Sequence, residues 1–125
     1  MERWKVLLVD DEPEFVSTLA ERLQLRGMDA RTAASGEEAL RLLESHRPHV
    51  VVTDVMMPGL GGMEVLQRIK KDYPEIQVIL LTGMTYAVDA AEGKRLGAFD
   101  SLMKPLDIEE LIKKITEAVA AFAEQ

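Results

Sequence analysis

Short apolar runs rich in β-branched residues recur along this chain and are separated by longer stretches with helical periodicity. The strongest runs cover residues 6–9, 50–52, 78–81 and 99–103, and a weaker one covers residues 28–32. Strands that alternate with helices predict βα units around a parallel sheet. Because the runs are continuous rather than alternating, we expect the sheet to be covered by helices on both faces.

The first two helices are marked by residues suited to their ends. A helix is expected over residues 12–26, with Asp11 available as its N-cap and Gly27 as its stop. A second helix is expected to begin at Ser35, because Glu38 follows three residues later at the spacing of a capping box. Each start lies shortly after an apolar run, as a crossover helix requires.

The later helices differ in how clearly the pattern predicts them. The third is expected to end before Pro74, and the last has one continuous apolar stripe. The buried positions of the third helix are Val65, Leu66 and Ile69, and the stripe of the last consists of Ile108, Leu111, Ile112, Ile115, Val119 and Phe122. The stretch 86–96 is the weakest helix, because Gly93 costs up to about 1 kcal/mol relative to Ala. It is either an element able to move or a loosely packed surface helix.

Composition and charge restrict the possible functions. The 125 residues have the length of one domain, and we expect a single domain over residues 1–125. A formal net charge of −7 argues against direct binding to nucleic acid or an anionic membrane. The absence of cysteine excludes disulfides and thiolate chemistry, and no apolar stretch approaches the roughly 18 residues of a membrane span. With no signal-peptide pattern either, a cytoplasmic location is expected.

Polar residues follow or close the apolar runs at four places. These are Asp10 with Asp11, then Asp54, then Thr82, and finally Lys104 with Pro105. The carboxyl ends of parallel strands meet at one edge of the sheet, where open α/β folds bind their ligands. Three carboxylates, a hydroxyl and an ammonium group are therefore expected in one crevice.

The pattern resembles the receiver domain of bacterial two-component response regulators. The matching segments are Val9-Asp10-Asp11-Glu12, Thr53-Asp54-Val55-Met56-Met57-Pro58-Gly59, Leu81-Thr82-Gly83 and Met103-Lys104-Pro105. The resemblance covers the whole chain. It implies a doubly wound, flavodoxin-like α/β fold with a five-stranded parallel sheet in the order 2-1-3-4-5 and five helices on both faces. It also implies a signalling domain rather than an enzyme, one that catalyses only its own phosphorylation and dephosphorylation.

The resemblance assigns a role to each carboxylate. Asp54 would accept a phosphoryl group from a phosphohistidine of a sensor kinase. Like charges about 4 Å apart repel by about 4 kcal/mol at an effective dielectric of 20, so three carboxylates call for a cation. Hard oxygen ligands favour Mg²⁺. By resemblance, Asp11, Asp54 and the backbone carbonyl of Met56 would bind it directly, and Asp10 would act through water. Asp11 could serve as helix cap as well.

The remaining site residues would handle the phosphoryl oxygens. Lys104 would pair with Asp54 in the empty site and with a phosphoryl oxygen in the loaded one. The resemblance implies a cis peptide bond between Lys104 and Pro105, a bond type that is accessible before proline. The Thr82 hydroxyl would follow the phosphoryl group, and Gly83 would offer its backbone amide.

One position departs from the family pattern. Receivers commonly carry an aromatic residue three positions before the lysine, which moves together with the threonine on activation. Here Ser101 stands at that switch position, so a signal has to leave by another route. Tyr86 and Phe99 are the nearby aromatic alternatives, although packing is the simpler role for both.

Other classes of function are less compatible with the sequence. Phosphatases of the haloacid dehalogenase type carry a second acid two residues after the nucleophile, where this chain has Met56. A flavodoxin-like nucleotide binder needs a phosphate-binding loop after the first strand, and an acidic loop stands there. A scaffold that binds partners regardless of phosphorylation stays open because of Ser101.

The resemblance also implies the kind of partner. A sensor histidine kinase or a phosphotransfer protein would supply the phosphoryl group, and the output would be a downstream protein target. The partner surface, and a possible homodimer contact, would be the face made by the fourth helix, fifth strand and fifth helix.

Overall fold

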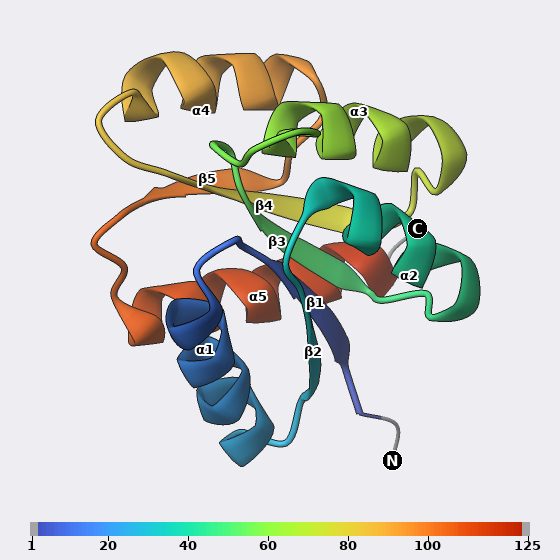
Figure 1. The fold of residues 1–125 in the computed structure, drawn as a ribbon. Coiled ribbons are helices and arrows are strands. Elements are labelled where there is room, and N and C mark those ends of the chain that lie inside the picture. Colours follow the sequence, from blue (N-terminus) through green and yellow to red (C-terminus); the bar gives the residue numbers. More distant parts are fainter. Residues whose placement is uncertain (1–2, 124–125) are drawn as a thin grey trace.

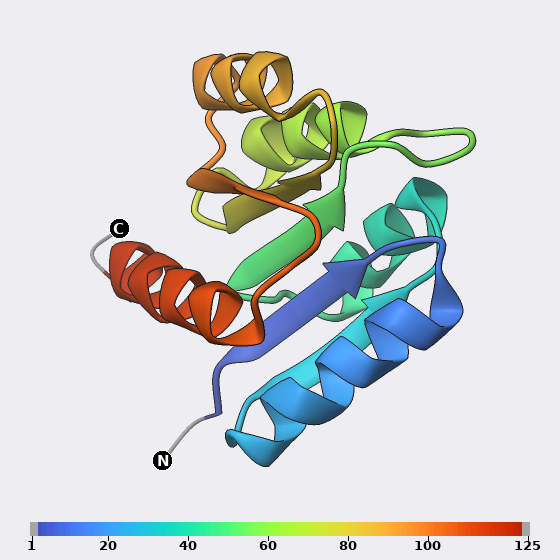
Figure 2. The same ribbon diagram turned by 90° about the vertical axis from the view of Figure 1, so that its left-hand side faces the viewer.

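The computed structural model describes residues 3–123 and contains one parallel sheet within them. Its strands are β1 (Lys5–Val9), β2 (Asp29–Ala33), β3 (Val50–Asp54), β4 (Gln77–Thr82) and β5 (Asp100–Met103), hydrogen-bonded in the order β2-β1-β3-β4-β5. All pairings are parallel, and the arrowheads in Figure 2 point the same way. The predicted flavodoxin-like order is confirmed.

Helices cover both faces of the sheet, as predicted (Figure 1). They are α1 (Pro13–Leu25), α2 (Gly36–Ser45), α3 (Gly62–Asp72), α4 (Tyr86–Arg95) and α5 (Ile108–Ala123). α1 and α5 lie on one face, while α2, α3 and α4 lie on the other. Boundaries differ from the expected ones by one or two residues, which is the usual uncertainty at helix ends.

The alternation of side chains along each strand divides the core into two apolar clusters. Val6, Leu8, Val50 and Val52 point toward α1 and α5, and the residues between them point toward the other helices. A sheet buried on both faces needs apolar residues at consecutive positions. This explains the continuous apolar runs of the sequence.

The ends of the first two helices test the capping predictions. The Ser35 side chain accepts the backbone N–H of Glu38 at 3.1 Å, which confirms this N-cap. Gly27, with a φ of 84°, follows α1 and confirms the predicted stop. The prediction that Asp11 caps α1 is wrong. Glu12 holds the N-cap position, and the N–H of Glu12 donates instead to Asp10 Oδ1 at 2.9 Å, in the two-residue turn that aspartate favours.

The helix that the sequence predicted least clearly is present as α4. Gly93 is the one buried residue in it, and all ten residues of α4 belong to the described part of the chain. A Cβ atom at Gly93 would lie 2.5 Å from Leu80 Cδ1. The glycine therefore allows α4 to approach β4 closely, which helix propensity alone does not indicate.

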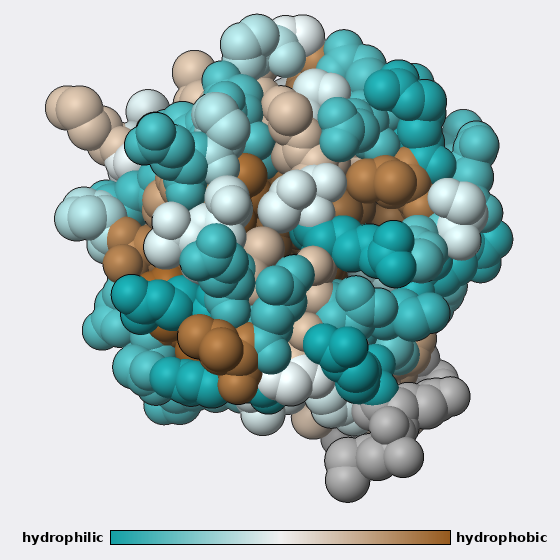
Figure 3. All heavy atoms as spheres, turned by 60° about the horizontal axis from the view of Figure 1, so that its bottom comes forward, coloured by the Kyte–Doolittle hydropathy of each residue, from teal (hydrophilic) through white to brown (hydrophobic). Residues whose placement is uncertain are grey.

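The outer surface on the side of α1 and α5 is mainly hydrophilic. Figure 3 shows this side, where hydrophobic residues form small separate patches. Within residues 3–123, no helix is long and apolar enough to cross a membrane.

Candidate functional site

The register of the sheet brings the predicted site residues to one edge. Asp54 is paired with Leu81, the residue before Thr82, and Thr82 is paired with Met103, the residue before Lys104. The N–H of Lys104 donates to the carbonyl of Thr82 at 2.7 Å. The hydroxyl residue and the lysine are thus fixed relative to each other by the backbone, and the Lys104–Pro105 peptide bond that follows is cis.

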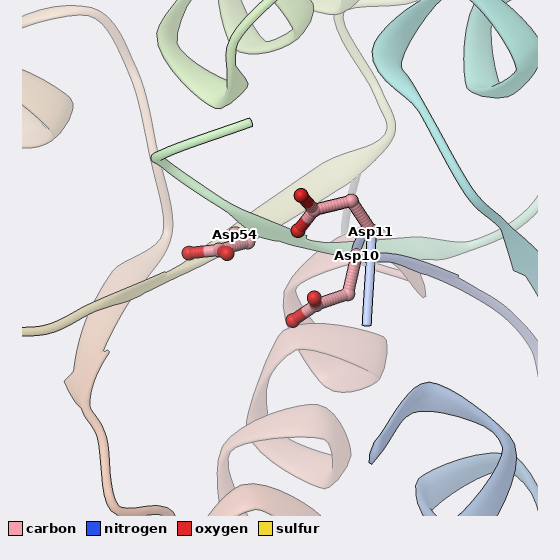
Figure 4. A group of neighbouring side chains, drawn as sticks. All are labelled: Asp10, Asp11 and Asp54. Atoms are coloured by element: carbon pink, nitrogen blue, oxygen red, sulfur yellow. The ribbon is translucent and has the colours of Figure 1, made fainter. Parts of the chain in front are cut away.

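Three carboxylates lie together at this edge (Figure 4). One carboxylate oxygen from each of Asp10, Asp11 and Asp54 lies within 4.8 Å of the others. Asp10 and Asp54 are buried, with 2% and 8% of their surface exposed, and Asp11 is exposed. Two of the three carboxylates are therefore largely shielded from solvent, and the third is open to it.

Lys104 places its ammonium group beside two of these carboxylates. Its Nζ lies 2.9 Å from Asp10 Oδ2, 3.4 Å from Asp54 Oδ2 and 3.6 Å from Glu12 Oε1. It also lies 4.6 Å from the centre of the Phe15 ring. The sequence predicted the pairing with Asp54, but the closest partner is Asp10.

Strand alternation explains why these three side chains meet. Asp10, Asp54 and Lys104 continue the positions of Leu8, Val52 and Leu102, which face α1 and α5. The buried core below them fixes the strand ends, so the charged atoms converge just above the apolar cluster. Thr82 falls on the opposite alternation and continues Leu80, on the side of α4.

The ionisation of the site reflects its burial. Burial raises the pKa of Asp54, the charge of Lys104 opposes this rise, and the charge of Asp10 adds to it. Burial lowers the pKa of Lys104, but its hydrogen bond to Asp10 and the charge of Asp54 outweigh this and raise the pKa overall. The single lysine does not fully compensate the carboxylates, so the pocket favours additional positive charge.

The donor set at this edge suits a hard cation. Carboxylate oxygens are the ligands that Mg²⁺ prefers, and the buried and exposed carboxylates lie close enough to share an ion. The Met56 carbonyl, predicted as a further ligand, stays a prediction. A backbone hydrogen bond from Met56 to Asp54 fixes this loop beside the carboxylate, and the Met56 side chain is exposed.

Thr82 and Ser101 are buried, with 1% and 4% of their surface exposed. The Thr82 hydroxyl donates to Asp89 Oδ2 at 2.5 Å, and the Thr85 hydroxyl donates to the same oxygen at 2.6 Å. The Tyr86 hydroxyl donates to the backbone carbonyl of Ser101 at 3.4 Å. The predicted switch positions therefore both contact α4.

Asp89 was missed by the sequence analysis. It stands in the first turn of α4, where an acidic residue also suits the helix dipole, so its presence there carries no special signal. Its contact with Thr82 depends on where α4 packs, and the pattern of apolar residues left that helix uncertain.

Gly62 and Gly83 lie beside Asp54 and Thr82, and they differ in how closely they are packed. A Cβ atom at Gly62 would lie 2.3 Å from the backbone oxygen of Asp54, and the Gly62 N–H donates to the Val55 carbonyl at 3.0 Å. Gly62 is therefore required by the close approach of α3 to the end of β3. A Cβ atom at Gly83 would meet nothing within 4 Å in the described part of the chain, so space alone does not require glycine there.

Comparisons with known proteins agree with this geometry. The family model of the response regulator receiver domain matches residues 6–116. The heme response regulator HssR of Staphylococcus aureus (strain Newman) is 39% identical over 109 residues, which are 87% of this chain and 48% of that protein. The probable transcriptional regulator ycf27 of Guillardia theta is 42% identical over 111 residues, which are 89% of this chain and 43% of that protein. This chain thus spans about half the length of these curated relatives.

Solved structures give the same result for the fold. A response regulator receiver domain protein from Clostridium thermocellum superimposes with a TM-score of 0.89 at 35% identity, covering 94% of each chain. The receiver domain of the Francisella response regulator 1452 superimposes with a TM-score of 0.88 at 31% identity, covering 94% of this chain and 98% of that one.

Proposed function

This chain belongs to the response regulator receiver family, and from that premise we propose that Asp54 accepts a phosphoryl group from a phosphohistidine with the help of Mg²⁺. Membership makes it a two-component signalling module rather than an enzyme acting on external substrates, and it implies a cognate histidine kinase. The acidic pocket with Lys104 is typical of the phosphoacceptor site of this family. The observation that carries the proposal is the buried Asp54 beside two further carboxylates and one lysine.

The transfer itself is a displacement at phosphorus. One carboxylate oxygen of Asp54 forms the new P–O bond, the P–N bond to the donor imidazole breaks, and the electron pair stays on the imidazole nitrogen. The nucleophile has to be ionised to attack. Lys104, at 3.4 Å from Asp54, counters the rise in pKa that burial causes and keeps the carboxylate available.

Lys104 has a second task in this proposal. Its ammonium group already lies between the Asp10 and Asp54 carboxylates, within reach of an oxygen of a group bound to Asp54. Phosphoryl transfer depends mainly on positioned positive charge, since charge spreads over the transferred oxygens. The Asp10 contact holds the lysine in place before the phosphoryl group arrives.

Asp11 and Asp54, with the Met56 carbonyl, would hold Mg²⁺, and Asp10 would contact it through water. The ion would supply positive charge that counters the negative charge on the oxygens of the transferred group. In the same proposal, the Thr82 hydroxyl and the Gly83 amide donate to phosphoryl oxygens once the group is in place. Thr82 has to leave Asp89 to do so.

The partners follow from the family and from charge. We propose that a sensor histidine kinase or a phosphotransfer protein donates the phosphoryl group, and that a protein target reads the outcome through the face made by α4, β5 and α5. This face could also form a homodimer. The formal net charge of −7 supports a protein partner for this domain over nucleic acid. The two curated relatives described above are named as regulators, one of them a probable transcriptional regulator.

The test is intact-mass analysis after incubation with a small acyl-phosphate donor. We expect one Mg²⁺-dependent phosphoryl adduct on the wild type, none on Asp54→Asn, and an unchanged adduct on Asp72→Asn, an exposed aspartate at the end of α3. An adduct that persists in Asp54→Asn would overturn the choice of nucleophile. No adduct on the wild type with Mg²⁺ present would favour the alternative, a receiver-like scaffold that binds partners independently of phosphorylation, which Ser101 keeps open.

A further inference from the structure

α4 is attached to the sheet by different means at its two ends. At its C-terminal end, Gly93 lies directly against Leu80, so close that a Cβ atom would not fit without a shift. At its N-terminal end, Asp89 accepts the Thr82 hydroxyl of β4, and Tyr86 donates to the Ser101 carbonyl of β5. One end is therefore fixed by close apolar contact and the other by polar contacts.

The polar contacts of α4 involve Thr82 and Ser101, which occupy the two switch positions of the receiver family. Asp89 and Tyr86 are three residues apart and so lie on one face of α4. That face reaches Thr82 on one strand and Ser101 on the next. Tyr86, not a residue of β5, brings an aromatic ring to the neighbourhood of Ser101.

The Thr82 hydroxyl has one proton to donate, and two acceptors compete for it. One is Asp89 Oδ2, a charged oxygen at 2.5 Å. The other, under the proposed function, is a phosphoryl oxygen on Asp54. A hydroxyl cannot donate to both, because each O–H makes one strong hydrogen bond. Occupation of the site therefore breaks the contact between β4 and the first turn of α4.

We propose that Asp89 is the positioning residue that couples the site to α4 in this chain. In the unmodified domain it holds the Thr82 hydroxyl away from the site and secures the N-terminal half of α4. When the hydroxyl turns to a phosphoryl oxygen, Asp89 retains only the exposed Thr85 hydroxyl, and this half of the helix opens while Gly93 stays against Leu80. The inference rests on the proposed function and supplies a route for the signal that does not need an aromatic residue at position 101.

α4 is packed weakly enough for one hydrogen bond to control the opening of its N-terminal half. Its other residues are exposed or half-buried, so a single hydrogen bond to a charged group is a large part of what secures the N-terminal half. Loss of that bond is expected to raise local opening about tenfold. An equal loss at α5 would have little effect, because several buried apolar side chains secure that helix.

The first test needs no phosphoryl chemistry. Amide hydrogen exchange is measured for residues 89–92 in metal-free protein without a donor. We expect roughly tenfold faster exchange in Asp89→Ala than in the wild type, with α5 unchanged, and wild-type behaviour in the matched control Asp72→Ala. Asp89→Asn keeps an acceptor oxygen and should restore most of the protection.

A double-mutant cycle separates the contact from a general effect of charge on α4. Thr82→Val removes the hydroxyl and leaves the helix untouched, so it should speed exchange in residues 89–92 to the same degree as Asp89→Ala, and the two together should add nothing. Thr85→Val should leave the exchange nearly unchanged. Additive effects of Thr82→Val and Asp89→Ala would overturn the contact as the cause.

The second test uses beryllofluoride with Mg²⁺ as a non-covalent phosphoryl mimic. Binding to the wild type should speed exchange in residues 89–92 to the level of unliganded Asp89→Ala. Asp89→Ala should show no further change while binding the mimic several-fold more tightly. If the mimic binds and α4 of the wild type stays protected, the coupling is overturned and the proposed function stands. If the mimic fails to bind and no adduct forms on Asp54, the proposed function fails and the coupling with it, whatever the metal-free exchange shows.

Discussion

α5 and α4 lie on opposite faces of β4, and they are secured in opposite ways. Ile79 and Leu81 face α5, which buries Leu111, Ile115, Ala118 and Val119. Leu80 and Thr82 face α4, of which Gly93 alone is buried among residues that the structure describes throughout. The same strand therefore carries a firmly packed helix on one side and a loosely packed one on the other.

This difference divides the site into two parts. Asp10, Asp54 and Lys104 stand on the side of α1 and α5, where a continuous apolar cluster fixes the strand ends. Thr82 and Ser101 stand on the side of α4 and contact it by polar groups. Under the proposed function, the charged part would hold its geometry while the hydroxyl part moves.

The largest expected change in the free energy of unfolding comes from α5, the firmly packed helix. Leu111→Ala removes a fully buried side chain from α5 and should lower the free energy of unfolding by about 2–5 kcal/mol, because it leaves a cavity. Urea denaturation followed by far-UV circular dichroism measures this. A loss below about 1 kcal/mol would contradict the description of α5 as the firmly packed helix.

The next effect tests the one close contact of α4. Helix propensity predicts that Gly93→Ala stabilises the protein by up to about 1 kcal/mol. The structure predicts the opposite, a loss of about 1–2 kcal/mol, because the added Cβ atom would collide with the fully buried Leu80. The double variant Leu80→Val, Gly93→Ala should recover part of the loss, and Ala91→Gly at an exposed position of the same helix serves as the propensity control. A net gain for Gly93→Ala would show that α4 is loosely held at both ends.

The free energy of unfolding, measured over a series of pH values, tests the charged part of the site. Burial raises the pKa of folded Asp54, so the ionised carboxylate destabilises the fold above that pKa, and the effect disappears as pH falls toward the unfolded value of about 3.9. Asp54→Asn should therefore be more stable than the wild type at pH 7, and the difference should shrink steadily as the pH is lowered to 4. The difference between the two unfolding curves is the relevant quantity, since all other carboxylates titrate in both proteins. A difference that grows with acid would contradict the burial effect.

The smallest effect is expected on the outer side of α4. Val88 is 71% exposed, so Val88→Ala should change the free energy of unfolding by less than about 0.5 kcal/mol. The same denaturation assay as for Leu111→Ala provides the contrast. A loss above about 1 kcal/mol would mean that α4 is packed more firmly than its burial indicates.

The sequence predicted the fold and the gathering of the site because both follow from strand periodicity. Five apolar runs predict a parallel sheet, and four of them end in polar residues. A parallel sheet brings Asp10, Asp54, Thr82 and Lys104 to one edge. No part of that reasoning depends on a particular side-chain conformation.

Details that depend on side-chain conformation were not predicted. The nearest partner of Lys104 is Asp10 rather than Asp54. Asp10 accepts the N–H of Glu12, the N-cap residue of α1, and Asp11 does not cap the helix. Both contacts depend on how the loop after β1 turns. The contact between Asp89 and Thr82 was not predicted, because the position of α4 depends on the close contact of Gly93 and on few apolar residues.

The contact of Gly62 with the end of β3 affects which changes the loop after Asp54 can tolerate. The hydrogen bond from Gly62 to Val55 and the close approach of Gly62 to the Asp54 carbonyl join the two ends of the segment 56–61. A loop closed at its base can lengthen, shorten or exchange its side chains with only a small change in closure entropy. The stretch that borders Asp54 can therefore diversify in sequence and length while Asp54 itself remains in register.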